Sequence, residues 1–266
     1  MVASSVSIYS RKAHVLGLIV AAAVIGSAIA VHASEIGIQF YSGQGGRTGE
    51  SLATNSTTSA GIVSQDNWNT SAASSWTSLA LYDNAGASTT ATLTGSANGQ
   101  YFGGGVNTTA GDIMLSSNEI YNSWSGVGTG ATLTFSGIPY SVYDVYVYAA
   151  IDSSGRNETI ELTPTGGSAS YQSFTTSGGP SWVIANNPVV GWNGIGTQPT
   201  AANATAAEFT GLTASSFVLN YGAPNNGAIN GVQIVAAAVP EPATLGLMVL
   251  AGAGILLAKR RHTKQA

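Results

Sequence analysis

The densest group of charged side chains lies in the stretch IDSSGRNETIEL. Asp152, Glu158 and Glu161 could act on a sugar, because glycosidases place two carboxylates about 5 to 9 Å apart across the scissile bond. Asp152, Asn157 and Glu158 could instead begin a calcium site, since Ca²⁺ takes six or more oxygen ligands. The third interpretation is a solvated turn in which Arg156 offsets the neighbouring acids.

Most other kinds of catalysis lack the side chains that they need. The three histidines, His14, His32 and His262, all lie outside residues 34–239, and the chain has no cysteine. A Ser-His-Asp or Cys-His triad needs an imidazole or a thiolate, and zinc sites are built mainly from His and Cys. The sequence therefore predicts a protein that is not an enzyme and has no resident cofactor, with calcium as the metal that the oxygen ligands allow.

The charge balance of residues 34–239 excludes a further class of partner. Arg47 and Arg156 are the only cations there, against eleven acidic residues, which gives a formal charge of −9. A surface so poor in Lys and Arg cannot neutralise phosphates, so we expect no binding of nucleic acid.

Tryptophans and amides are the side chains that could bind a ligand. Sugar rings stack their C–H faces on aromatic rings, while neighbouring amides and carboxylates bond the hydroxyls. Two of the five tryptophans have amide neighbours in DNWNT and NSW, and a pair of tyrosines follows one expected strand. In a β-sandwich many tryptophans belong to the core, so a structural role is the alternative. The candidate carbohydrate-binding residues are Trp68, Trp124, Asn67, Asn69, Tyr146 and Tyr148.

Short strands must position these residues. Alternating or continuous apolar runs rich in β-branched and aromatic residues lie between clusters of Gly, Ser, Asn and Pro. Five such runs are strong: 131–138, 143–150, 158–164, 215–221 and 230–236. The weaker ones are 35–41, 76–82, 91–95, 111–115, 169–175, 181–185 and 206–210. Many short strands at this spacing predict an all-β fold, an antiparallel β-sandwich or jelly roll.

The run YDVYVYAA is apolar on both faces. Val145, Val147 and Ala149 point one way, whereas Tyr146 and Tyr148 point the other. We expect either a central strand covered on both sides or a strand whose tyrosines line a groove.

The N-terminal residues have the pattern of a secretory signal peptide helix. Arg11 and Lys12 precede an apolar run at 15–29, and small residues follow it. We expect signal peptidase to cut after Ala33 or, as the alternative, after Ala30. An uncleaved signal anchor is the other interpretation, although fifteen apolar residues are short for a membrane span.

A second apolar run, at 243–258, predicts a single transmembrane helix. A helix of this length covers about 24 Å, and snorkelling by the basic residues that follow can supply the rest of a ~30 Å hydrocarbon core. Basic residues at 259–266 favour a cytoplasmic end for this helix, with residues 34–236 outside the cell. The alternative is a core helix, which Pro240 and Pro242 oppose by separating the run from the rest of the chain.

Three ordered elements of this tail resemble the PEP-CTERM sorting signal of exported bacterial proteins. They are the Pro240-Glu241-Pro242 motif, the apolar run directly after it, and the basic cluster Lys259, Arg260 and Arg261. The resemblance implies recognition by exosortase, a membrane-embedded protease that cuts near Pro-Glu-Pro, and a setting of extracellular polysaccharide. Residues 65–70 and 229–235 resemble parts of the secreted sandwich modules that accompany such tails, and INGVQIV at 229–235 is similar to the last strand of galactose-binding-like jelly rolls.

These observations predict a signal peptide at 1–33, an extracellular β-sandwich at 34–236, and a sorting signal at 237–266. We expect an exported protein of the cell surface or extracellular matrix, anchored at first by its C-terminal helix and able to bind extracellular polysaccharide. The alternatives are a polysaccharide-active enzyme with paired carboxylates and a matrix protein with no ligand.

Overall fold

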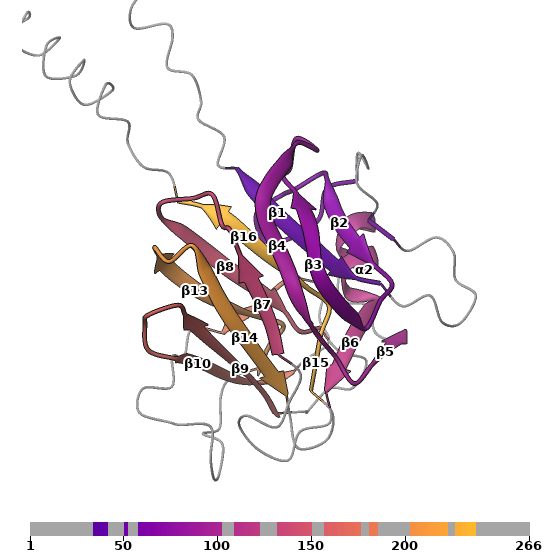
Figure 1. The fold of residues 1–266 in the computed structure, drawn as a ribbon. Helices are drawn as coiled ribbons and strands as arrows, with labels where there is room; N and C mark the ends of the chain where they lie inside the picture. The colour runs from indigo at the N-terminus through magenta and orange to yellow at the C-terminus, as the bar shows by residue number, and fades with distance from the viewer. Residues whose placement is uncertain are drawn as a thin grey trace, which may run out of the picture. The chain divides into compact units, whose positions relative to one another are not determined.

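The chain folds into two facing β-sheets with a third, smaller sheet beside them (Figure 1). The structure, a computed structural model, describes residues 34–41, 51–52, 58–102, 109–122, 132–150, 157–176, 181–185, 203–222 and 227–237. These residues all belong to one compact unit, Ala33–Ala266. The prediction of a β-sandwich is confirmed.

The six-stranded sheet has the order β11-β13-β8-β16-β1-β2. Its strands are β1 (Glu35–Phe40), β2 (Trp68–Ser71), β8 (Tyr143–Tyr148), β11 (Ile184–Ala185), β13 (Ala206–Leu212) and β16 (Gly231–Ala236). The two strands furthest apart in sequence lie side by side at its centre, because β1 pairs antiparallel with β16 from Glu35↔Val235 to Gln39↔Gly231. β16 also pairs antiparallel with β8, so it is hydrogen-bonded on both sides.

The seven-stranded sheet has the order β12-β10-β9-β14-β7-β4-β3. Its strands are β3 (Ser75–Tyr82), β4 (Ser88–Ser96), β7 (Thr132–Ser136), β9 (Asn157–Pro164), β10 (Ser170–Thr176), β12 (Asn203–Ala204) and β14 (Ser216–Gly222). The small sheet joins β5 (Gly99–Phe102), β6 (Asn118–Asn122) and β15 (Gly227–Ile229).

Aromatic and branched side chains from the two large sheets form the main core. Phe217 of β14 stacks on Phe135 of β7 with ring centroids 4.9 Å apart, and Tyr143 of β8 contacts Phe217 from the opposite sheet at 6.3 Å. Phe40 of β1 and Trp76 of β3 make a second contact between the sheets, at 5.3 Å. Along each strand, apolar side chains alternate with polar ones, so the apolar side chains gather on the inner face of each sheet.

The strand β8 is covered on both faces, which is the first of the two interpretations of its sequence. Val145 and Val147 lie in the main core, whereas Tyr146 and Tyr148 lie in a second apolar cluster on the outer face of the six-stranded sheet. Both tyrosines are buried, so they line no open groove.

Three expectations from the sequence differ from the structure. The run at 111–115 is the helix α2 (Ala110–Ser116), because Thr109 caps it: the hydroxyl of Thr109 accepts a hydrogen bond from the amide of Asp112. Of the run at 181–185, only β11 is strand. The sheets also contain parallel pairs, β1 with β2, β10 with β12 and β11 with β13.

Truncating the aromatic stack should destabilise the sandwich strongly. Phe217→Ala removes a fully buried ring that joins both sheets, and we expect a loss of about 3–5 kcal/mol in the free energy of unfolding. Urea denaturation measures it. Val218→Ala is the matched control: this neighbour points to the opposite, half-exposed face, and a comparable loss there would contradict the assignment of the core.

Alkaline pH should destabilise the sandwich from about pH 10 upward. Burial raises the pKa of Tyr143 from 10.0 to about 12. The unfolded chain therefore releases this proton first, so the stabilising effect is complete below pH 10 and is lost as the pH rises through about 12. Urea denaturation across this range measures the fall. Tyr143→Phe, which has no ionisable hydroxyl, should show a smaller fall; an equal one would contradict the prediction.

Candidate functional site

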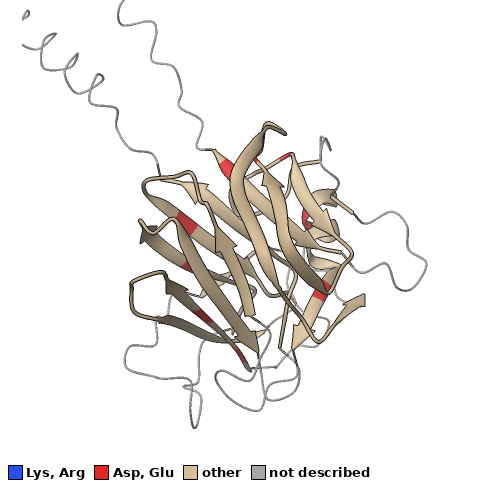
Figure 2. Cartoon of the chain, in the orientation of Figure 1, with Lys and Arg blue, Asp and Glu red and all other residues tan. Residues whose placement is uncertain are grey.

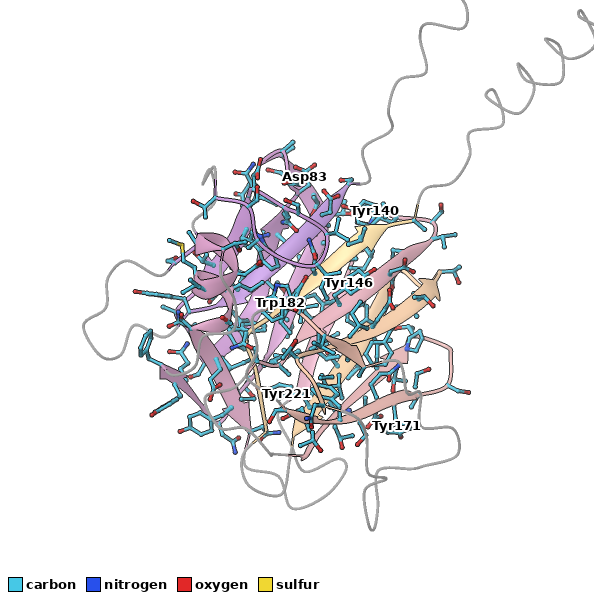
Figure 3. The ribbon with its side chains drawn as sticks, turned by 180° about the vertical axis from the view of Figure 1, so that it is seen from behind. Asp83, Tyr140, Tyr146, Tyr171, Trp182 and Tyr221 are labelled. Carbon is cyan, nitrogen blue, oxygen red and sulfur yellow. The ribbon has the colours of Figure 1, made fainter. Side chains whose placement is uncertain are left out.

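The outer face of the six-stranded sheet carries the second apolar cluster and the polar groups around it. Segment 58–67, helix α2 and the side chain of Trp182 cover one end of this face. Figure 3 views the molecule from this side, with Tyr146 and Trp182 labelled over the sheet.

Beneath this cover, a buried tyrosine fixes the loop at 61–65 to the sheet. The Tyr148 hydroxyl accepts a hydrogen bond from the amide of Ile62 (2.8 Å) and donates one to Gln233 Oε1 (2.7 Å). Gln233 in turn donates through Nε2 to the carbonyl of Val63 (2.7 Å). Burial raises the pKa of Tyr148, so its phenol stays neutral and acts as a structural group.

Trp182 is the tryptophan that the structure holds half-exposed on this face. Its ring meets that of Tyr148 edge-on, with centroids 4.6 Å apart, and its Nε1 donates to Asp112 Oδ1 at 2.9 Å. The same carboxylate oxygen accepts the amide of Gly61 (2.8 Å), where a positive φ of 97° favours glycine. Asp112 therefore fixes both the loop and the indole ring.

A second aromatic–carboxylate pair lies on the neighbouring strands. Tyr146 of β8 is directly opposite Glu208 of β13, and the two side chains are hydrogen-bonded. Burial, then this bond and the negative charges of Glu208 and Asp144, raise the pKa of Tyr146. Glu208 and Asp144 are half-exposed, so the face combines aromatic rings with solvent-accessible carboxylates.

The structure corrects the role predicted for Trp68. Its side chain has 0% exposure, and its Nε1 donates to the carbonyl of Gln65 at 3.0 Å. The ring lies against Gly37, where an added Cβ would come within 2.7 Å of it. A ring with no exposed face cannot stack on a sugar, so Trp68 is a core residue.

The amides next to it are also used within the fold. Asn69 donates to the carbonyls of Gly37 (2.8 Å) and Tyr82 (2.9 Å), and it accepts the amide of Tyr82 (2.9 Å). Asn67 donates to the carbonyl of Asn84. These bonds connect the edge of one sheet to a strand of the other. Trp124 lies outside the described residues.

The structure does not bring Glu158 and Glu161 together. Glu158 points into the sandwich, where Oε2 accepts the amide of Ala228 at 3.1 Å. Glu161 lies three residues along β9 and therefore on the opposite face, where Oε1 accepts the hydroxyl of Thr163 at 3.2 Å. These two carboxylates cannot flank one glycosidic bond.

The predicted calcium ligands Asp152 and Asn157 have side chains outside the described residues. Among the described residues there is no group of three or more His, Cys, Asp or Glu side chains that could hold a metal ion.

Sequence reasoning missed Trp182, the half-buried ring of this outer face. It has no Asn or Asp beside it in PSWVIA, and its polar partner Asp112 stands 70 positions away. Asp112 and Trp182 meet only because the tertiary fold places helix α2 and the segment before β11 on the same outer face.

The comparison with protein families identifies the tail. The chain matches the model of the PEP-CTERM protein-sorting motif over residues 238–261, a range that contains Pro240, Glu241 and Pro242 and the basic Lys259, Arg260 and Arg261. Curated proteins and solved structures give no match to this chain. The motif marks an exported protein with a C-terminal sorting tail that exosortase recognises.

The predicted transmembrane helix at 243–258 lies outside the described residues. Within the described ranges, no helix is long and apolar enough to cross a membrane.

Removing the Asp112 carboxylate should loosen the cover of the outer face. Asp112→Ala leaves the half-buried amide of Gly61 and the indole of Trp182 without their acceptor, and we expect a loss of about 2 kcal/mol in unfolding free energy. Urea denaturation followed by tryptophan fluorescence measures it. Asp66→Ala is the control, because this carboxylate is exposed and accepts the exposed hydroxyl of Ser59 in the same segment; an equal loss would show that Asp112 has no special role.

Proposed function

We propose that the exported sandwich is a non-enzymatic module that binds carbohydrate on the outer face of its six-stranded sheet. The observation that carries this proposal is the half-exposed ring of Trp182, held by Tyr148 below and by Asp112 beside it. A ring fixed in this way loses little conformational entropy when a sugar stacks on it.

The polar groups nearby have the chemistry that sugar hydroxyls need. Asp112 and Glu208 are half-buried carboxylates. Asp112 already accepts hydrogen bonds from Gly61, Trp182 and Thr109, so its remaining lone pair, with those of Glu208, provides the acceptors for sugar hydroxyls. Aromatic stacking combined with a few polar groups is the usual composition of a small-molecule site.

The charge of the surface favours a neutral glycan over an acidic one. Throughout the described ranges, the charged side chains are all Asp or Glu (Figure 2). An acidic polysaccharide would meet only like charge there, whereas an uncharged chain of sugars would not be repelled.

The sorting tail supports an extracellular location, where polysaccharides are found. As the resemblance to exported proteins of polysaccharide-producing bacteria implies, the sandwich works outside the cell. We propose that signal peptidase removes residues 1–33 and that 243–258 anchors the chain in the membrane with the basic tail in the cytoplasm. Exosortase then processes it at the cell surface.

Replacing the half-buried ring of Trp182 should weaken glycan binding while leaving the fold intact. In affinity gels with neutral polysaccharides, the full chain in mild detergent should be retarded, and Trp182→Ala should weaken that binding by about tenfold or more, since aromatic anchors contribute 2 kcal/mol or more.

Tyr82→Ala is the matched control, because it removes an aromatic side chain of 40% exposure from the other large sheet. Retardation that does not change in Trp182→Ala would reject this site. Self-association without any dependence on sugar would instead favour a matrix protein with no ligand.

A further inference from the structure

The fold continues almost up to the sorting motif. β16 ends at Ala236, whose amide donates to the carbonyl of Ser34 (2.9 Å), and the amide of Ala237 donates to the carbonyl of Val142 (2.9 Å). Pro240 stands three residues beyond Ala237. An extended chain spans at most ~3.6 Å per residue, so the Cα of Pro240 lies within about 11 Å of that of Ala237.

A protease that binds Pro240, Glu241 and Pro242 must surround them with its own residues. The residues that form the active-site cleft of the protease therefore come next to Ala237, unless β16 first separates from the sheet. Separation is costly, because β16 is hydrogen-bonded to β1 on one side and to β8 on the other. It would also expose Ile234, which is 1% exposed in the main core.

We propose that one end of the sandwich docks directly against exosortase when the sorting motif enters its active site. This exit end consists of Ser34, the turn at 83–87, the loop at 138–142, and Ala236 with Ala237. The proposal rests on the sorting function that the motif indicates and is independent of glycan binding.

Short-range hydrogen bonds make the exit end rigid. In the turn, Asp83 Oδ1 accepts the amides of Ala85 (2.9 Å) and Ala87 (2.8 Å), and the amide of Asn84 donates to the carbonyl of Glu35 (2.8 Å). A surface that is already ordered pays little entropy on binding.

The loop beside the turn is held in the same way. The hydroxyl of Tyr140 donates to Ser34 Oγ at 3.0 Å, and the amide of Ile138 donates to the carbonyl of Ser215 at 2.9 Å. Figure 3 shows Asp83 and Tyr140 at this end of the sheets, where β1 begins and β16 ends.

Apart from the half-buried carboxylate of Asp83, small, uncharged side chains cover the exit end. Its exposed residues are Ala85, Ala87, Pro139 and Ser141. Such a surface permits close approach of another protein, and little solvation is lost when it is covered. The enzyme is also nearer than the lipid, because the apolar run begins at residue 243, beyond the motif.

Arginines at the exit end should slow sorting. In cells that contain exosortase, pulse-chase labelling gives the rate at which the full chain is processed, and mass spectrometry locates the new C-terminus near Pro240. We expect Ala87→Arg and Ser141→Arg to process about tenfold more slowly or worse, because a long charged side chain blocks close contact and loses hydration in the docked complex.

Thr94→Arg and Thr132→Arg are the matched controls, since both residues are exposed on the outer face of the seven-stranded sheet. They should process at the rate of the unmodified chain. Thermal unfolding of each purified variant shows that it has folded.

A flexible linker of ten Gly and Ser residues after Ala237 provides the second measurement. It removes the need for contact, so the arginine variants with the linker should process as fast as the unmodified chain with the linker. Three results would overturn the proposal: no slowing, slowing that persists with the linker, or faster processing. Faster processing would assign the exit end to the anionic bilayer instead. A Trp182→Ala variant that loses glycan binding but is sorted normally separates the two proposals.

Discussion

The structure depends on covering both faces of the six-stranded sheet. β8 and β16 present apolar side chains in both directions, so the sheet cannot leave one face in water as many antiparallel sheets do. The seven-stranded sheet covers the inner face. On the outer face, helix α2 and the loop at 61–65 serve the same purpose, and Tyr148 and Asp112 bind them in place. The candidate site is a by-product of this requirement, because the segment that carries Trp182 belongs to the cover.

The chain achieves this without disulfides, and its described residues include no lysine or arginine. Neutral hydrogen bonds replace ion pairs: buried amides such as Gln233, Asn69 and Asn230 connect the strands to the loops. Such bonds depend little on salt, in contrast to surface ion pairs. For a protein outside the cell, where ionic strength varies, this is a suitable basis for stability.

Much of the fold could be predicted from the sequence, because the central strands carry a clear period of two. For 143–150 the alternation left two interpretations, a strand covered on both faces or one whose tyrosines line a groove, and the structure shows the first. The strand predicted at 111–115 was wrong, because GDIML is a short apolar run like those of the strands, while Thr109, which caps the helix α2, lies just outside the run. The candidate site could not be predicted in the same way. Trp68 has the amide neighbours typical of a sugar site, yet those amides bond the backbone, and the pair Trp182 and Asp112 forms only through tertiary contacts.

The pairing of β1 with β16 has a consequence for the order of events during export. Glu35 and Val235 face each other across 200 positions of sequence, so a chain that emerges N-terminus first cannot close its central sheet until nearly all of it has been translocated. A prematurely terminated chain would leave β1 and β8 with open edges, which invite aggregation and proteolysis. The sorting motif begins two residues after β16 ends. An enzyme that selects this motif therefore also selects the chains that are long enough to have completed their fold.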